Sequence, residues 1–136
     1  MKRGSGVEHE ELTRKIIGSA YRVYNKMGSG FLESVYENCM LIELRKLGID
    51  VVPQHPITVH YEGQVVGSFT ADLFVTGLVI VELKAVRTVL AVHEVQLVNY
   101  LRATGIEVGL LINFGDKSVE VRRKLRELPD EDETGF

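Results

Sequence analysis

Residues 70–84 read Thr70-Ala71-Asp72-Leu73-Phe74-Val75-Thr76-Gly77-Leu78-Val79-Ile80-Val81-Glu82-Leu83-Lys84. Two apolar runs flank a Thr-Gly pair, a pattern that predicts two antiparallel strands joined by a tight turn. Three charged side chains, Asp72, Glu82 and Lys84, lie in segments that otherwise look like the interior of a sheet. Because an ionised group in a protein core is costly unless it is paired or binds a metal, this stretch is predicted to contain a functional site.

The length of the turn decides whether the two carboxylates can act together, because side chains alternate between the two faces of a strand. A two-residue turn at 76–77 would turn the acids to opposite faces. A three-residue turn at 75–77, with its glycine left-handed, would place Asp72 opposite Ile80. Glu82 would then be a diagonal neighbour of Asp72, about 7–8 Å away on the same face, and the lysine would share that face.

Two carboxylates on one face would suit a hard divalent cation. Mg2+ prefers oxygen ligands and keeps several waters, so Asp72, Glu82 and the backbone carbonyl of Leu83 are predicted ligands. The ion would lower the pKa of a bound water and neutralise charge on a phosphoryl oxygen, while Lys84 would orient the water or stabilise the transition state. A salt-bridged pair, with the lysine leaving the end of a strand, is the structural alternative.

The rest of the chain predicts helices at 8–27, 32–47 and 89–103, from apolar residues at helical spacing. Strands are predicted at 51–61, 65–75, 78–84, 106–113 and 118–121. The strand at 106–113 follows a crossover helix, so it is expected to run parallel to an earlier strand. The order α-α-β-β-β-α-β-β predicts an α/β fold of the α+β type, with a mixed central sheet flanked by helices.

The length of 136 residues fits one domain, predicted over residues 1–126, followed by an acidic C-terminal tail at 127–136 that is expected to be disordered. Five of the 19 acidic residues lie in this tail, so the other 14 face 16 basic residues, a balance compatible with a polyanionic partner. The single cysteine favours a reducing compartment. No segment resembles a secretory signal or approaches the roughly 20 apolar residues of a membrane helix, so a soluble cytoplasmic protein is expected.

Asp72, nine further residues and then Glu82-Leu83-Lys84 resemble the signature of the PD-(D/E)XK nuclease-like superfamily. Residues 30–36, Gly-Phe-Leu-Glu-Ser-Val-Tyr, match the Gly-x-x-Glu-x-x-Tyr motif of its GxxExxY branch. Residues 96–101 resemble the Gln-x-x-x-Tyr helix of RecB-like nucleases, and residues 113–115, Asn-Phe-Gly, also resemble the branch. The resemblance covers about residues 8–125, with Ala71 where the superfamily usually has proline.

This resemblance implies a restriction-endonuclease-like core in which Glu33, Asp72 and Glu82 gather around Mg2+ or Mn2+ beside the lysine. Gln96 and Tyr100 are four residues apart, hence on one helical face, and would be further catalytic residues that reach the site or a phosphate. The implied activity is that of a metal-dependent nuclease, in which a metal-activated water hydrolyses a phosphodiester of DNA or RNA.

Several of these residues also have a plainer explanation. If Gly30 is the N-cap of its helix, Glu33 occupies the third helical position, where a carboxylate favourably meets backbone N–H groups. Gln96 and Tyr100 could lie on a solvated helix face, opposite an apolar stripe that includes Leu90. Tyr36 lies on the apolar stripe of its helix and is expected in the core. The basic run at 122–126 could contact phosphates or form a solvated face.

Two other functions remain open from the sequence. One is a non-catalytic module that keeps the fold and binds nucleic acid or a protein, with the charged triad as a relic. The other is a metal-dependent hydrolase of a small phosphorylated molecule. A homodimer would cover a nucleic-acid duplex better than one domain of this size.

Overall fold

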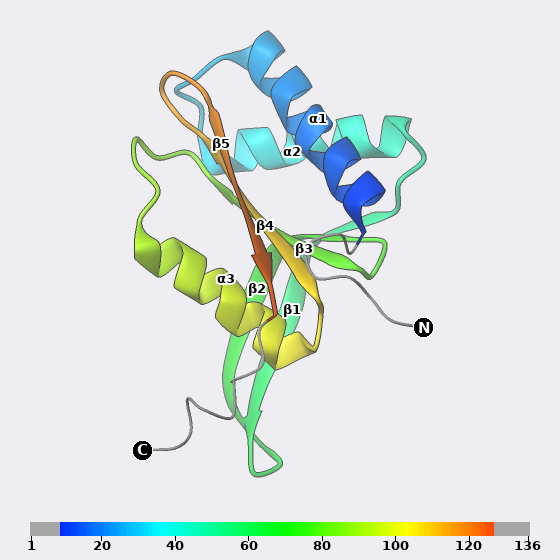
Figure 1. Ribbon diagram of the computed structural model, residues 1–136, viewed down its shortest axis with the longest axis vertical. Helices are drawn as coiled ribbons and strands as arrows, with labels where there is room; N and C mark the ends of the chain where they lie inside the picture. The colour runs from blue at the N-terminus through cyan, green and yellow to red at the C-terminus, as the bar shows by residue number, and fades with distance from the viewer. Residues whose placement is uncertain (1–8, 127–136) are drawn as a thin grey trace.

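The computed structural model describes residues 9–126, which form three helices and five strands. In chain order these are α1 (Glu10–Met27), α2 (Glu33–Lys46), β1 (Val51–Tyr61), β2 (Gln64–Val75), β3 (Val79–Lys84), α3 (Ala91–Thr104), β4 (Val108–Phe114) and β5 (Val119–Leu125). The strands build one sheet in the order β1-β2-β3-β4-β5 (Figure 1). β3 and β4 are parallel, and the other neighbouring strands are antiparallel. The predicted α+β fold, with its mixed sheet and its order of elements, is confirmed.

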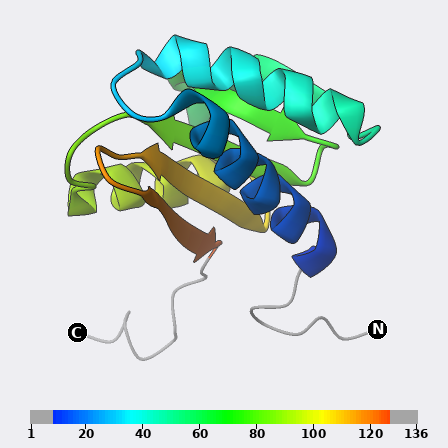
Figure 2. The same cartoon turned by 90° about the horizontal axis from the view of Figure 1, so that it is seen from above.

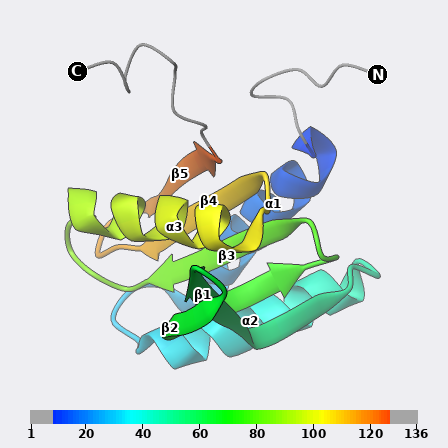
Figure 3. The ribbon, with the colours of Figure 1, turned by 90° about the horizontal axis from the view of Figure 1, so that it is seen from below.

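The sheet lies between two layers of helix. α1 and α2 cover one face and α3 covers the other, as the views from above and below show (Figures 2 and 3). Val81 of β3 packs in the buried cluster under α1 and α2, whereas Ile80 packs in the cluster under α3. Residues 79–83 are all buried, which explains why β3 reads as a nearly continuous apolar run. Glu82 is the one charged residue among these five.

α3 is the crossover connection between the parallel strands β3 and β4. A Cβ atom at Gly109 of β4 would lie 2.8 Å from Cδ1 of Leu97, which is closer than real Cβ atoms approach other groups. The glycine therefore lets α3 lie tightly on the sheet. This close approach brings the side chains of α3 near the charged residues of β2 and β3.

The turn between β2 and β3 decides which residues share a face. Thr76 and Gly77 both have left-handed backbones, with φ of 50° and 71°, and the N–H of Leu78 donates to the carbonyl of Val75 at 2.9 Å. These are the features of a tight hairpin turn with two left-handed central residues. Val75 nevertheless pairs with Val79, so Leu78 is an additional residue of the bulge type.

The predicted three-residue turn is correct in length and wrong in position. The unpaired residues are 76–78 rather than 75–77, so Phe74 pairs with Ile80 and the register differs by two from the expected one. Asp72 is consequently in line with Glu82 and not with Ile80. A shift of two does not by itself move Asp72 to the face opposite Glu82 and Lys84.

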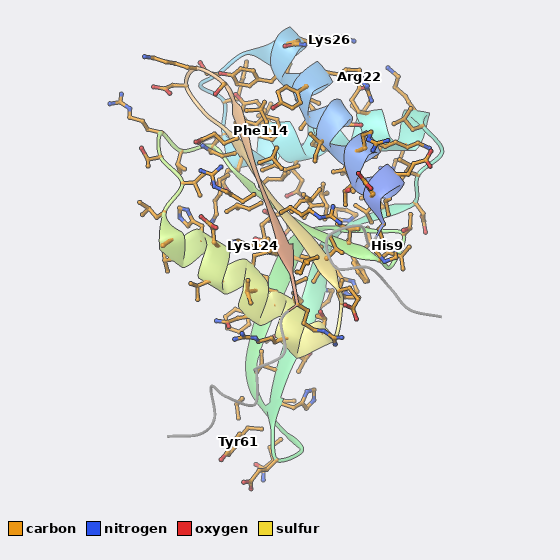
Figure 4. All side chains as sticks on the ribbon, viewed as in Figure 1. His9, Arg22, Lys26, Tyr61, Phe114 and Lys124 are labelled. Carbon is orange, nitrogen blue, oxygen red and sulfur yellow. The ribbon has the colours of Figure 1, made fainter. Side chains whose placement is uncertain are left out.

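β1 and β2 form a long hairpin that projects beyond the rest of the sheet (Figure 1), with Tyr61 at its tip (Figure 4). β2 pairs with β3 only through residues 73–75. Across from Asp72 lies Gln54 of β1, whose backbone is left-handed with φ of 51°. Ala71 and Phe74, three residues apart, both pack against the cluster under α3, so the regular alternation of β2 is interrupted between them. The hairpin leaves the sheet at Asp72.

Tyr36 closes the loop between α1 and α2. Its hydroxyl donates to the carbonyl of Gly28 at 2.6 Å and accepts from the N–H of Phe31 at 3.3 Å. Its ring is fully buried and stacks on Phe114, with the ring centroids 4.3 Å apart. The expectation that Tyr36 belongs to the core is confirmed, and the last residue of the Gly-x-x-Glu-x-x-Tyr motif has a structural task.

We expect Tyr36→Phe to lower the free energy of unfolding by about 1–3 kcal/mol, because the change leaves a backbone carbonyl and an N–H without their partner. Urea unfolding would measure this loss. Tyr21→Phe is the matched control, since Tyr21 is 46% exposed on α1 and its change should leave stability the same. Equal stability of the two variants would contradict the role given to the Tyr36 hydroxyl.

The strand ends differ most at β5, which extends to Leu125 rather than to the predicted Val121. Residues 122–124 continue the antiparallel ladder with β4, opposite 109–111, so the basic run belongs to a strand. The predicted acidic tail, residues 127–136, lies outside the described residues. Within residues 9–126, no helix is long and apolar enough to cross a membrane.

Candidate active site

Asp72 and Glu82 lie where β2 separates from β3, one position beyond the last paired residues of the ladder, Leu73 and Val81. The N–H of Asp72 donates to Oε2 of Glu82 at 3.1 Å. In return, the N–H of Leu83 donates to Oδ2 of Asp72 at 2.8 Å. Each carboxylate therefore replaces a ladder carbonyl as the acceptor for the opposite strand, and both side chains are held at the gap between the strands.

The backbone of Leu83 also points to this gap. In an extended strand, the N–H and the C=O of one residue face the same neighbouring strand. Because the N–H of Leu83 reaches Asp72 on β2, its carbonyl is directed toward β2 as well. The predicted role of this carbonyl as a metal ligand stays a prediction.

The two acids are difficult to ionise together in this position. Glu82 is 8% exposed, and its burial, together with the charge of Asp72, raises the pKa of Glu82 to about 8. Burial also raises the pKa of Asp72, although the Leu83 N–H, the charge of Lys84 and a hydrogen bond from Gln54 oppose this shift. A site that raises the pKa of two adjacent carboxyl groups is one that a bound cation would stabilise.

Lys84 ends β3 on the same side, half-buried, and its charge lowers the pKa of both carboxyl groups. Within residues 9–126, no ion pair joins Lys84 to Asp72 or Glu82 at 4.0 Å or less. The salt bridge of the structural alternative is therefore absent between Lys84 and these two acids among the described residues.

Asn113, which pairs with Lys84 in the parallel ladder, fixes the chain that follows the lysine. It is fully buried, its Oδ1 accepts from the N–H of Val86 at 2.9 Å, and its Nδ2 donates to the carbonyl of Val86 at 2.8 Å. The same Nδ2 donates to Oε1 of Glu120 at 3.0 Å. These hydrogen bonds hold the end of β3 in place, and they give the Asn-Phe-Gly sequence at 113–115 a structural role.

Glu33 is the first residue of α2 and is exposed, with Leu32 as the N-cap. The expectation that Gly30 is the N-cap and Glu33 the third helical residue is wrong, although a carboxylate in the first turn remains favourable. The charge of Glu33 raises the pKa of Glu82, so the two lie within electrostatic range. Across residues 9–126, however, no three acidic, histidine or cysteine side chains are placed to hold one metal ion, so a ligand role for Glu33 stays a prediction.

Glu37 and Gln54 belong to the neighbourhood of the site, and sequence reasoning missed both. Gln54 donates to Oε1 of Glu37 at 2.8 Å and also bonds to Asp72, whose pKa it lowers. Burial, and then the charge of Asp72, raises the pKa of Glu37. The four-residue spacing from Glu33 to Glu37 could have indicated the acidic helix face, whereas no sequence signal marks the left-handed backbone of Gln54.

A family model described as the PD-(D/E)XK nuclease superfamily matches residues 10–124. The chain belongs to the PD-(D/E)XK nuclease superfamily. Nucleases of this superfamily generally use divalent metals. No curated protein matches the chain significantly in sequence.

Among solved structures, the one titled "Crystal structure of SSO0001" is similar over 90% of this chain, with a TM-score of 0.55 and 16% sequence identity. At this identity the likeness concerns the fold alone. The chain spans 62% of the length of that structure's chain.

The donor set of this superfamily member fits a divalent cation in its chemistry. Mg2+ is typically bound through one or two carboxylates, with waters in the other positions. Asp72 and Glu82 supply two carboxylates, and among the described residues 9–126 no hydrogen-bond donor occupies Oε1 of Glu82. The site therefore has free acceptor capacity on a pair of acids that repel each other.

α3 brings a phenol to the same place. Nε2 of Gln96 donates to the hydroxyl of Tyr100 at 2.8 Å, and Tyr100 is 6% exposed. Burial raises the pKa of Tyr100, and the charge of Glu82, followed at smaller size by that of Asp72, raises it further. The tyrosine predicted by the resemblance thus lies within electrostatic range of the acids.

The interpretation of α3 as having Tyr100 on a solvated face is wrong. Tyr100 packs in the core with Leu97 and Leu101, whereas Leu90, which was expected in the core, is 54% exposed. His93 accepts the N–H of Leu90 through Nδ1 at 3.1 Å, so its task is to begin the helix.

The basic residues at 122–126 form ion pairs with glutamates of the same chain. Lys124 pairs with Glu94 at 2.6 Å, and Arg126 with Glu107 at 2.7 Å. Arg122 lies 3.7 Å from the same Glu94 carboxylate. These ion pairs attach β5 to α3 and to the start of β4, so the run is explained without a phosphate.

Proposed function

We propose that the chain is a metal-dependent nuclease of the GxxExxY branch, which hydrolyses phosphodiester bonds of nucleic acid. The observation that carries this proposal is the reciprocal pair of hydrogen bonds that fixes Asp72 and Glu82 at the separation of β2 and β3, with Lys84 beside them. Membership of the superfamily supports the nuclease class, and the fit of residues 30–36 to the Gly-x-x-Glu-x-x-Tyr motif supports the branch.

Asp72, Glu82 and the carbonyl of Leu83 would hold Mg2+ or Mn2+, and Glu33 would add negative charge from the first turn of α2. When bound, such an ion supplies a more acidic water and neutralises charge on a phosphoryl oxygen. The carboxylates bind and orient the ion, while the hydrogen bonds between the strands keep them from turning away to solvent.

Lys84 would donate to a non-bridging oxygen of the phosphodiester, where negative charge develops during attack by water. Its position at the end of β3, held through the Asn113 and Val86 hydrogen bonds, sets the direction of that donor in advance. Tyr100 would donate from α3 toward the same phosphate, and Gln96 would keep the phenol in place.

The test is a cleavage assay on labelled single-stranded and double-stranded DNA and RNA. We expect the wild-type protein to cleave at least one of these with Mg2+ or Mn2+ and to be inactive in excess EDTA. Glu82→Ala should be inactive with either metal, whereas Glu11→Ala, which removes an exposed carboxylate of α1, should cleave as the wild type does.

Two outcomes would overturn the proposal. Cleavage that survives EDTA, or that survives Glu82→Ala, would mean that this site does not carry the activity. Retained binding of nucleic acid without cleavage at any metal concentration would instead support a non-catalytic module of the same fold.

A further inference from the structure

A groove of about 730 Å³ lies between α3 and the hairpin of β1 and β2. Helix and hairpin are in contact beside it, and Figure 1 shows α3 next to the two strands. The volume is within the range of small-molecule sites, about 300–1,000 Å³. The hairpin that forms one wall is the segment that leaves the sheet at Asp72, and Phe69, three residues before Asp72 on β2, lines the groove.

The wall of the groove is apolar and unusually exposed. Val92 and Val95 of α3 are 63% and 56% exposed, and Phe69 of β2 is 43% exposed. The ring of Phe69 lies against Tyr100 with the centroids 5.6 Å apart. Contiguous exposed apolar side chains of this kind mark an interaction site in a soluble protein.

The groove includes two of the predicted catalytic residues, Gln96 and Tyr100. Tyr100 lines the groove, and the charges of Glu82 and Asp72 raise its pKa. Gln96, which bonds to the Tyr100 hydroxyl, lines the groove as well. A molecule lying in the groove would therefore contact Gln96 and Tyr100, the two α3 residues that the proposed function uses.

The polar lining of the groove suits an anionic chain. Arg102 and Asn99 of α3 lie along it, and none of its lining residues is acidic. Arg102 forms no ion pair with any residue in the range 9–126, whereas Arg122 and Arg126 are paired with glutamates. A guanidinium without an ion pair among these residues is available to a phosphate, and the amide of Asn99 can bond to the edge of a base.

We propose that this groove binds the unpaired bases next to the scissile phosphodiester, so that the substrate of the proposed nuclease is single-stranded nucleic acid. Unpaired bases expose their flat faces, which stack on aromatic and apolar side chains, whereas the faces of bases in a duplex are covered by their neighbours. Phe69 is the stacking side chain, Arg102 contacts the backbone, and Tyr100 joins the base site to the carboxylates.

The inference rests on the proposed function, and its test measures binding without cleavage. Fluorescence anisotropy in EDTA would compare labelled oligothymidylate, oligouridylate and a DNA duplex of equal length. We expect both single strands to bind more tightly than the duplex, with the difference between the two reporting on DNA against RNA. Phe69→Ala should weaken single-strand binding about tenfold, within the 1–3 kcal/mol of one stacked base.

Three further variants separate lost contacts from a disturbed fold. Val95→Glu places a negative charge on an exposed position of the groove and should weaken single-strand binding at least as much. Tyr21→Ala, on α1 away from the groove and 46% exposed, should bind as the wild type does. Lys117→Ala, which removes an exposed charge between β4 and β5, should also bind as the wild type does, because the lysine lies outside the groove lining.

Tighter binding of the duplex, or single-strand affinity unchanged in both Phe69→Ala and Val95→Glu, would overturn the inference. Self-association of the wild type that these two variants abolish, without nucleic-acid binding, would assign the groove to a second copy of the chain instead. Metal-dependent cleavage that the groove variants do not change would overturn the inference about the groove and support the proposed nuclease function. Single-strand binding that the groove variants weaken, without any cleavage, would support the groove as a binding site and overturn the nuclease function.

Discussion

Lys84→Ala is expected to reduce the rate of nucleic-acid cleavage by about 10²–10³-fold, the usual cost of removing one donor aimed at developing negative charge. The variant should bind Mn2+ at least as tightly as the wild type, because a positive charge that lowers the pKa of both carboxyl groups also repels a cation. Single-turnover cleavage and calorimetric titration with Mn2+ would measure the two quantities on the same preparations.

The matched control for this prediction is Lys117→Ala, since Lys117 is exposed in the turn between β4 and β5. Its cleavage and its Mn2+ affinity should both equal those of the wild type. A Lys84→Ala protein that cleaves normally would exclude the lysine from the reaction. Loss of Mn2+ binding together with cleavage would show that Lys84 maintains the site and does not act on the phosphate.

Glu82→Gln is expected to stabilise the metal-free protein at pH 8 while it abolishes metal binding and cleavage. The ordinary pKa of a glutamate is 4.5, and burial followed by the charge of Asp72 raises that of Glu82 to about 8. Between these values the folded protein holds a proton that the unfolded chain has released. Stability from this group is complete below pH 4.5 and is lost as the pH rises toward 8, by at most about 1.4 kcal/mol per pH unit.

Urea unfolding in EDTA, repeated from pH 5 to pH 8, would measure this dependence. The wild type should lose stability as the pH rises, Glu82→Gln should show a flatter profile, and the two should be closest near pH 5, where the glutamate is neutral. Glu11→Gln, with its exposed carboxylate, should follow the wild type. A wild-type profile as flat as that of Glu82→Gln would contradict the burial and repulsion described for the site.

The gain in metal-free stability and the loss of activity expected of Glu82→Gln have one cause. The hydrogen bonds that hold Asp72 and Glu82 face to face place two like charges close together in a largely buried position. Such an arrangement costs folding free energy in the absence of a cation. The same arrangement is what would let the pair hold the proposed divalent metal, so a gain in metal-free stability and a loss of activity are expected to accompany each other.

Much of the site could be predicted from residues 70–84, because the length of a hairpin turn determines which side chains of its two strands lie on the same face. In a regular ladder, Asp72, Glu82 and Lys84 share a face whenever the turn contains an odd number of unpaired residues. The turn does, although the additional residue is Leu78 on the β3 side and not Val75. Sequence does not fix that choice, since both positions are apolar.

The contributions of other elements were harder to predict. Gln54 of β1 donates to Glu37 of α2 and lowers the pKa of Asp72, and the charge of Asp72 raises the pKa of Glu37. The approach of these side chains depends on how the hairpin bends away from the sheet. The burial of Tyr100 depends in the same way on the close approach of α3 at Gly109. Both are consequences of packing between segments that are distant in the sequence, which periodicity within one segment does not report.

A crystal of the wild-type protein soaked in Mn2+ tests the central claim most directly, because manganese is identified by its anomalous scattering. We predict one strong anomalous peak in the gap between β2 and β3, in contact with the carboxylates of Asp72 and Glu82 and the carbonyl of Leu83. The peak should be absent from Glu82→Gln crystals soaked in the same way. A gap without manganese in the wild type, with the ammonium of Lys84 moved between the two carboxylates, would contradict the metal site and leave the three charges as a structural ion pair.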